Sequence, residues 1–229
     1  MNRKSIILRI LPFAFFVLLT SLQGQWGESS RYWGYCLKTV VVAGLVAYLW
    51  PKIKEMRPVF SWEALVAGIV VFIIWIGLDG FYPKTGELWA KLSGTPLKPT
   101  ASWNPFSFYG FYEDNLLLAW SVVFTRIAGA TCLVPLVEEV FYRSFLYRFL
   151  IQEKFEKVPL HHFSLLPFLG VSLLFGLVHH EWLAGFLCGL IYQGLVCYKG
   201  RLGDAITAHG VTNLLLGIWV VWKGAWNFW

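Results

Sequence analysis

Long apolar stretches joined by mostly short polar connections dominate this chain and limit what it can fold into. Eight stretches each approach the ~20 mainly apolar residues that a membrane-spanning helix requires. They cover residues 6–22, 33–50, 61–78, 116–134, 135–151, 163–179, 182–198 and 204–222. Backbone groups in lipid need partners within their own segment, so each stretch is expected to be a helix. The sequence predicts an all-α polytopic membrane protein, a bundle of about eight hydrophobic helices in one membrane domain.

The composition supports a membrane setting and argues against other classes. Hydrophobic residues make up 57% of the 229 residues and charged residues only 14%, against about 25% charged in soluble domains. The 13 Trp residues suit the membrane–water interface, where amphipathic rings collect. The net charge of +6 is scattered between apolar stretches without a basic stripe. We therefore expect membrane lipids as partners and no nucleic acid.

The first apolar stretch shares part of its pattern with a signal peptide. Arg3 and Lys4 precede it, but no small-x-small cleavage pattern follows it, so we expect an uncleaved first span. The same two basic residues favour a cytoplasmic position for this end of the chain. The four cysteines form no CxxC pattern, and we expect neither a disulfide framework nor a zinc motif from them.

The positions of other basic residues extend this orientation only in part. Lys52 and Lys54 fall on the same side as the N-terminus after two spans, as the positive-inside rule favours. Lys154 and Lys157 follow the stretch 135–151. Their side stays open, because it depends on whether that stretch crosses the membrane fully or only halfway.

A long polar connection, residues 79–115, divides the chain into two parts. Three spans and this connection make up residues 1–115, and residues 116–229 hold the remaining spans. Its Pro, Gly and Asn residues are typical of a surface loop, with one short interfacial helix expected around residues 88–92. The other connections are short, so we expect neighbouring helices to be antiparallel.

Two adjacent acids stand out in the second part, because charge at membrane depth is costly and suggests function. Pro135 favours a helix start, which would place Glu138 and Glu139 in a first turn where the helix dipole favours negative charge. Glu139 and Arg143 are four residues apart, in the order that pairs best. Glu138 lies about 100° around the helix and lacks this partner. A capping acid with an interfacial ion pair is the alternative interpretation.

Two further polar pairs lie on later helices. Phe175 and His179 share one helix face at a spacing of four residues, and His180 follows directly. His209 and Asn213 share another face in the same way. The alternatives are interfacial or packing histidines and hydrogen bonds between helices. Together with Glu138, these pairs supply a carboxylate, two imidazoles and an amide, enough to activate water and stabilise an oxyanion.

Two basic residues complete the set at membrane depth. Lys38 lies near the end of its stretch, where a long side chain can reach the interface. Arg126 lies in the middle of its stretch, and we expect it to meet a carboxylate whose identity stays open.

The three motifs EExxxR (Glu138, Glu139, Arg143), FxxxH (Phe175, His179) and HxxxN (His209, Asn213) occur in this order on successive apolar helices. This arrangement resembles the CAAX prenyl endopeptidase and bacteriocin-processing (CPBP or Abi) family, over roughly residues 116–222. The resemblance implies an eight-helix bundle around an intramembrane cavity and a protease of glutamic type.

The resemblance also implies a role for each motif residue. Glu138 would activate water, and His179 would help to hold it. His209 and Asn213 would polarise the scissile carbonyl and stabilise the oxyanion. Glu139 and Arg143 would form a structural pair that fixes the motif helix, with Phe175 as a supporting residue. His180 is an alternative to His179, although the FxxxH spacing favours His179.

The resemblance leaves the setting and two competing functions open. The size of the chain and its three-span N-terminal part resemble compact bacterial members, one subgroup of which accompanies exosortase-type protein sorting in exopolysaccharide-producing bacteria. We therefore expect a multi-pass protein of the bacterial cytoplasmic membrane that cleaves membrane-associated proteins or peptides without a cofactor. A zinc site formed by Glu138, His179 and His209 is a minor alternative. The other alternative is a non-enzymatic immunity or scaffold protein that binds a peptide or another membrane protein.

Overall fold

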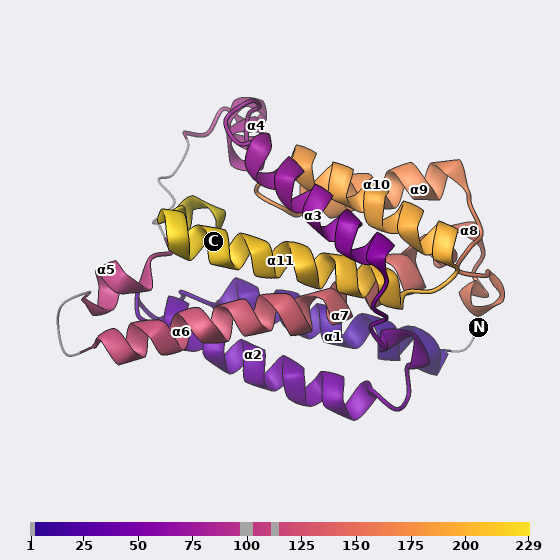
Figure 1. Cartoon of the computed structure of the whole chain (residues 1–229), viewed down its shortest axis with the longest axis horizontal. Helices are drawn as coiled ribbons and strands as arrows, with labels where there is room; N and C mark the ends of the chain where they lie inside the picture. Colours follow the sequence, from indigo (N-terminus) through magenta and orange to yellow (C-terminus); the bar gives the residue numbers. More distant parts are fainter. Residues whose placement is uncertain (1–2, 97–102, 111–114) are drawn as a thin grey trace.

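The computed structural model describes residues 3–96, 103–110 and 115–229, which form helices and no strand. Figure 1 shows these helices as one elongated bundle. The α-helices are α1 (Arg3–Leu22), α2 (Ser30–Leu49), α3 (Trp62–Gly77), α4 (Thr85–Ser93), α5 (Pro105–Tyr109), α6 (Leu116–Ala128), α7 (Val134–Glu139), α8 (Tyr147–Ile151), α9 (Leu165–Leu177), α10 (Trp182–Lys199) and α11 (Gly203–Lys223).

The expected break between residues 116–134 and 135–151 is wrong, since one continuous helix of 36 residues runs from Leu116 to Ile151. Two π-helical segments, Gly129–Leu133 and Val140–Leu146, interrupt its α-helical parts without ending it. Pro135 therefore lies inside a helix rather than at a free N-terminus. The preceding π turn accommodates the proline, because Val134 donates its N–H to Gly129 O, five residues back. Eight apolar helices were predicted, and the described residues form seven.

The prediction of an all-α polytopic membrane protein is confirmed. Within the residues described, four helices are long and apolar enough to cross a membrane, namely α1, α2, the continuous helix from Leu116 to Ile151, and α11. The apolar helices α3 and α9 are shorter. Large apolar side chains cover the outside of the bundle, such as Val40 at 69% and Leu166 at 82% exposure. A water-facing surface would not favour them, whereas lipid does.

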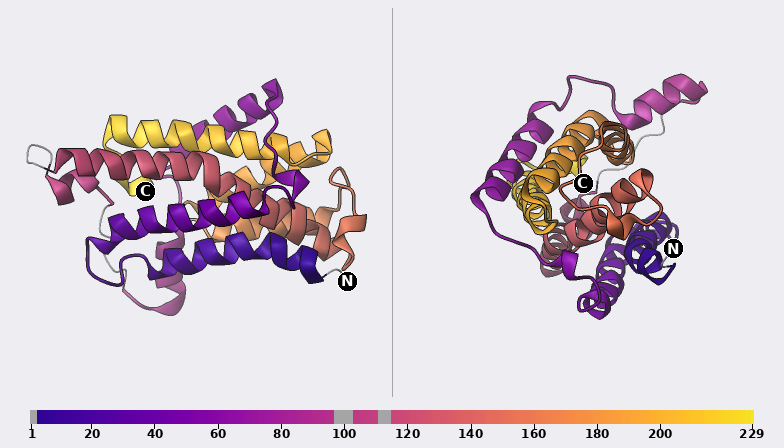
Figure 2. Two further views of the ribbon diagram at one scale, coloured as in Figure 1. Left: turned by 90° about the horizontal axis from the view of Figure 1, so that it is seen from below. Right: turned by 90° about the vertical axis from the view of Figure 1, so that its right-hand side faces the viewer.

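Small residues set the spacing on one side of the bundle, where α3, α9, α10 and α11 pack together (Figure 2). A Cβ atom at Gly176 of α9 would lie 2.5 Å from Trp182 O of α10. A Cβ atom at Gly68 of α3 would lie 2.6 Å from Ala208 O of α11. Glycine at these positions lets the helix backbones approach closely, as is common between membrane helices.

One end of the bundle collects the N-terminus and the connections after α2, α8 and α10. Ser5 donates to Glu156 at 2.6 Å, and Val59 N donates to Gly203 O at 3.1 Å. Because Ser5 contacts Glu156, Lys154 and Lys157 lie at the same end of the bundle as the N-terminus. We call this region the closed end.

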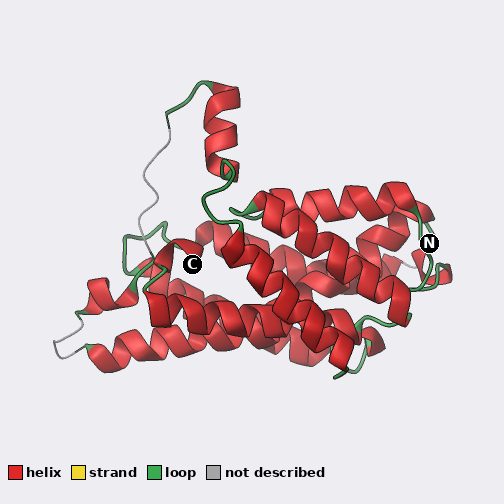
Figure 3. Ribbon diagram, turned by 45° about the horizontal axis from the view of Figure 1, so that its top comes forward, coloured by secondary structure: helices red, strands yellow, loops and turns green. Residues whose placement is uncertain are grey.

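The connection between α3 and α6 lies at the opposite end. The expected short helix around residues 88–92 is present as α4, which projects from the bundle (Figure 3). A second short helix, α5, was not expected. It begins at Pro105 after the capping residue Asn104, whose side chain accepts from Phe106 N at 3.1 Å. Residues 97–102 and 111–114 of the predicted loop lie outside the described part of the chain.

Candidate active site

A cavity of about 810 Å³ lies inside the bundle, and it brings the predicted site residues together. The residues lining it include Glu138, Phe175, His179, His209 and Asn213, which come from α7, α9, the turn after α9, and α11. The other lining residues belong mainly to the C-terminal half of α1, the N-terminal half of α2, α6, and the end of the chain. These segments lie away from the closed end (Figure 1).

Glu139 does not face the cavity but holds two neighbours in place. Its Oε1 lies 3.2 Å from Arg143 Nη1 and 2.9 Å from His209 Nδ1. Glu139 is fully buried and Arg143 is 1% exposed, so the predicted ion pair is present and shielded from water. The guanidinium also lies 4.2 Å from the centre of the Phe175 ring.

The contact with His209 is the part of this arrangement that the sequence did not predict. A carboxylate oxygen can only accept, so His209 Nδ1 carries the proton in this contact. The second nitrogen, Nε2, is then the one available to the cavity. Glu139 therefore fixes both the tautomer and the orientation of this imidazole.

Glu138 differs from Glu139 in having no ionic partner among the described residues. It is 8% exposed and lines the cavity, and its Oε2 is buried without a hydrogen-bond partner among the described residues. The two π-helical segments lie before and after α7, which carries both acids. Such segments are frequent at functional sites.

His179 is oriented by the backbone of its own helix. Its Nδ1 lies 2.5 Å from Phe175 O, and since a carbonyl oxygen accepts, Nδ1 is the protonated nitrogen. The ring packs against Phe175 at 4.6 Å and against Trp75 at 5.5 Å between centroids. The FxxxH motif thus supplies both an aromatic wall and a carbonyl acceptor. His180 also lines the cavity, so lining alone does not separate the two histidines.

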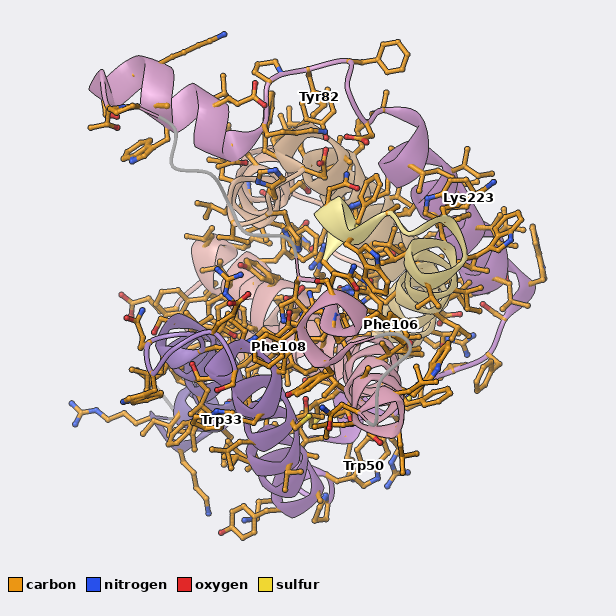
Figure 4. All side chains as sticks on the ribbon, turned by 90° about the vertical axis from the view of Figure 1, so that its left-hand side faces the viewer. Trp33, Trp50, Tyr82, Phe106, Phe108 and Lys223 are labelled. Carbon is orange, nitrogen blue, oxygen red and sulfur yellow. The ribbon has the colours of Figure 1, made fainter. Side chains whose placement is uncertain are left out.

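The loop between α3 and α4 holds the turn that carries His179, a role that sequence reasoning missed. Tyr82 Oη donates to Glu181 at 2.7 Å, Lys84 pairs with the same carboxylate, and Thr85 Oγ1 donates to His179 O at 2.6 Å. Burial and the bond to Glu181 raise the pKa of Tyr82 above its usual value. Figure 4 shows Tyr82 on this loop. The acid Glu181 directly before an apolar stretch was the available signal.

Asn213 forms a hydrogen bond to a backbone carbonyl that the irregular helix opposite it leaves free. Its Nδ2 donates to Ala130 O at 2.8 Å. Val134 donates to Gly129 O instead, and Pro135 has no N–H, so the helix itself leaves Ala130 O without its usual donor. Asn213 satisfies this carbonyl with one amide hydrogen, which leaves the other hydrogen for the cavity.

The structure differs from the expectation for Lys38 and gives Arg126 surroundings that were not expected. Lys38 does not reach the interface, since it is 4% exposed and lines the cavity. Arg126 meets no carboxylate within the described ranges. Its guanidinium instead lies 5.0 Å from the ring centre of Tyr35, 4.2 Å from that of Trp103 and 5.2 Å from that of Trp229. Aromatic rings attract the cation through their electron-rich faces.

Comparison with known proteins gives one match. Residues 118–215 match a protein family described as type II CAAX prenyl endopeptidase Rce1-like. The matched range contains all three motifs. No curated protein and no solved structure matches the chain.

Proposed function

We propose that the chain is an intramembrane endopeptidase of glutamic type, because residues 118–215 match the Rce1-like family of type II CAAX prenyl endopeptidases. Its substrates would be membrane-associated proteins or peptides. The observation that carries the proposal is the meeting of Glu138, His179, His209 and Asn213 in one cavity, where Glu138 has no ionic partner within the described part of the chain.

The arrangement supports a hydrolysis in two steps. In the first step, Glu138 takes a proton from a water molecule held by His179 Nε2, and the water oxygen attacks the scissile carbonyl carbon. His209, with its Nδ1 hydrogen bonded to Glu139 and a proton on Nε2, and the second amide hydrogen of Asn213 stabilise the oxyanion. In the second step, the C–N bond breaks, and Glu138 returns the proton to the leaving amine.

The basic residues support an orientation in a bacterial cytoplasmic membrane. The closed end carries Lys and Arg in each of its connections, namely Lys52, Lys54, Arg57, Lys154, Lys157, Lys199 and Arg201, besides Arg3 and Lys4. The positive-inside rule places this end in the cytoplasm. The cavity then opens toward the extracytoplasmic side, where components of a protein-sorting or exopolysaccharide system would supply substrates. Labelling of single cysteines from outside tests this orientation.

The central experiment compares variants of the purified protein in detergent with candidate membrane-anchored peptides. We expect Glu138→Gln and His209→Ala to lower the cleavage rate by about 100-fold or more, because each removes a group that acts in the reaction. Glu153→Gln, which changes an exposed acid at the closed end, is the matched control and should cleave as the parent does. Equal cleavage by Glu138→Gln and the parent would refute the glutamic mechanism.

Two further measurements test the alternatives. If Glu138→Gln restores the phenotype of a deletion strain, the protein acts by binding, as an immunity or scaffold protein would. Zinc at stoichiometry, with activity lost to a chelator, would support a metal site. Within the described ranges, no three His, Cys, Asp or Glu side chains are grouped in a way that could hold a metal ion, so we assign no metal role to these residues.

A further inference from the structure

The short helix α4 has an apolar face that is largely exposed. Leu88, Trp89 and Leu92 lie on one side of this helix, since residues three and four apart share a face. Leu92 is 81% exposed, and Trp89 is exposed beside it. Glu87 and Lys91 lie on the other side of the helix. An exposed apolar stripe opposite charged residues is typical of a helix that rests on another apolar surface.

The axis of α4 lies across the long axis of the bundle. The right-hand panel of Figure 2 looks along the bundle, and α4, magenta as in Figure 1, is there seen from its side. The spanning helices run along the bundle, so a helix that lies across it is parallel to the membrane plane. This is the geometry of an interfacial helix, whose apolar face sits at the boundary between headgroups and acyl chains.

The helices beside α4 are short, which brings α4 close to the hydrocarbon core. Both α3 and α9 begin at the closed end, with 16 and 13 residues. At a rise of about 1.5 Å per residue, their lengths are about 24 Å and about 20 Å. The hydrocarbon core is about 30 Å thick, and the bilayer accommodates a short span by local thinning. The segment that follows α3 therefore lies at the level of lipid.

The apolar surface of α4 has exposed apolar neighbours that face the same bilayer. Phe81, in the loop before α4, is 83% exposed, and Val178, after the end of α9, is exposed as well. Thr85, the first residue of α4, donates its N–H to His180 O at 3.1 Å. The helix thus begins beside the lipid-facing end of α9, and one bilayer can contact both.

The start of α4 also holds the turn that carries His179. Thr85 Oγ1 donates to His179 O at 2.6 Å. Lys84, one residue earlier, pairs with the buried Glu181 in the same turn. One hydrogen bond therefore connects the backbone of α4 with the backbone of the proposed catalytic histidine, and a displacement of α4 would reach that residue directly.

We propose that α4 binds the phospholipid surface of the bilayer and that this contact fixes the turn of His179. The catalytic consequence rests on the proposed function. Leu88, Trp89 and Leu92 would lie at the boundary between headgroups and acyl chains, and Thr85 would transmit this position to His179. The protease would then be fully organised only where α4 contacts lipid, which is also where a membrane-anchored substrate is found.

A lipid surface is favoured over a protein partner because the bilayer already surrounds the helix ends beside α4. Trp89 and Phe81 are aromatic, the kind of side chain that collects at the membrane boundary. Three side chains on one short helix also bury far less than the roughly 800 Å² per partner of a stable protein interface. A second copy of the chain and a soluble partner are outcomes of the test.

The first measurement is the depth of α4 in liposomes of phosphatidylcholine and phosphatidylglycerol, and it requires no enzyme activity. A nitroxide is attached to Leu92→Cys or, as the matched control, to Lys91→Cys on the other side of the helix. Both variants carry Cys132→Ser, because Cys132 is an exposed cysteine. We expect oxygen, which concentrates in lipid, to relax the first label, and a water-soluble nickel chelate to relax the second.

Two results of this measurement would overturn contact with lipid. Equal access of the nickel chelate to both labels would leave the apolar face in water, free for a soluble partner. Spin–spin broadening between labels on Leu92→Cys would assign the face to a second copy of the chain.

The second measurement follows the coupling to the turn, again without enzyme activity. A nitroxide on Val178→Cys, next to the proposed catalytic histidine, reports the mobility of the turn in the same liposomes. Trp89→Gln/Leu92→Gln should raise that mobility, because α4 loses its hold on the bilayer. Glu87→Gln/Lys91→Gln changes the other side of α4 and should leave the mobility unchanged. Equal mobility in the parent and in both double variants would overturn the coupling.

The third measurement is cleavage of a membrane-anchored peptide in these liposomes. Trp89→Gln/Leu92→Gln should lower kcat by about 10- to 100-fold with KM little changed, because a small misplacement of a catalytic group has an effect of this size. Thr85→Val should lower kcat similarly while the label on Leu92→Cys keeps its depth. The combined variant should be no slower than the slower parent variant, since both changes break one link.

Multiplication of the two losses in the combined variant would overturn transmission through Thr85. Failure of the proposed function has a different signature. If Glu138→Gln cleaves as the parent does, the glutamic mechanism fails, yet the two spin-label measurements still decide the lipid contact and its coupling to the turn.

Discussion

The closed end and the cavity treat buried charge in opposite ways. At the closed end, Glu55 accepts from both Arg9 and Arg148, at 2.8 and 2.9 Å. Asp204 pairs with Arg201 at 2.5 Å, and Glu63 pairs with Lys199 at 2.7 Å. In the cavity, by contrast, Glu138, Lys38 and Arg126 have no partner of opposite charge among the residues described.

The paired charges at the closed end stabilise the bundle, whereas the unpaired charges in the cavity are available to a ligand. A buried charge costs free energy unless it is paired, and the closed end meets this requirement within the chain. The cavity leaves the charges of Glu138, Lys38 and Arg126 without counter-charges among the described residues. Such an arrangement is useful only if substrate and water interact with these side chains. Glu139 lies between the two cases, because its neighbour His209 lines the cavity, whereas Glu139 itself is paired with Arg143 and His209.

The largest effect on stability is expected at Glu139, because replacing this carboxylate removes the partner of a buried cation. Glu139→Gln leaves the guanidinium of Arg143 buried without a counter-charge, and we expect a loss of about 3–5 kcal/mol in the free energy of unfolding. Denaturation in mixed micelles measures it. The double variant Glu139→Gln/Arg143→Met should recover much of this stability, and a double variant as unstable as the single one would contradict the ion-pair explanation.

The same double variant separates folding from catalysis. Without the Glu139 carboxylate, His209 loses the acceptor that fixes its Nδ1 proton, so cleavage should stay low even where stability recovers. Full activity in the double variant would show that Glu139 serves only to balance Arg143.

A smaller loss is expected at the closed end itself. Glu55→Gln removes the acid shared by Arg9 and Arg148, whose bonds to it are charge-assisted. Because Glu55 is 22% exposed in its side chain, water offsets part of the loss, and we expect about 2 kcal/mol. Glu153→Gln is the exposed control at the same end, and a similar loss there would show that the network adds nothing.

The network also predicts how stability depends on pH. Burial raises the pKa of Glu55, but the nearby charges of Arg148 and Arg9 outweigh it, so the pKa lies below its usual value. The stabilisation is therefore present above the pKa of the unfolded chain and is lost as the pH falls through the lower, folded value. The parent should lose stability in acid more steeply than Glu55→Gln, and parallel curves for the two proteins would contradict this linkage.

Local spacing in the sequence predicted contacts within one helix and failed for contacts between helices. The four-residue spacing of Glu139 and Arg143 indicated their ion pair, which is present at 3.2 Å. The bond of Glu139 to His209 joins residues 70 positions apart. Only the packing of α11 against α7 brings them together, so no local pattern could show it.

Proline chemistry explains the main error about the fold. Pro135 is compatible with a helix start, and from local sequence a start was the simpler interpretation. The structure instead absorbs the missing N–H in a π turn, and Asn213 of α11 satisfies the carbonyl left free. The ring partners of Arg126 were not visible in the sequence for a similar reason, because they come from three distant segments. Side chains supplied by the tertiary fold decided both cases.

The smallest effect, and the one of opposite sign, is expected at Lys38. Lys38→Met replaces an unbalanced cation with an apolar side chain of similar length, so the protein without ligand should become more stable by about 1 kcal/mol. Denaturation in mixed micelles, run beside Glu55→Gln, measures the sign directly. A loss as large as that of Glu55→Gln would mean that Lys38 belongs to the structural charges. A gain would mean that the charge of Lys38 is kept for something outside the chain, because no acid among the described residues pairs with it.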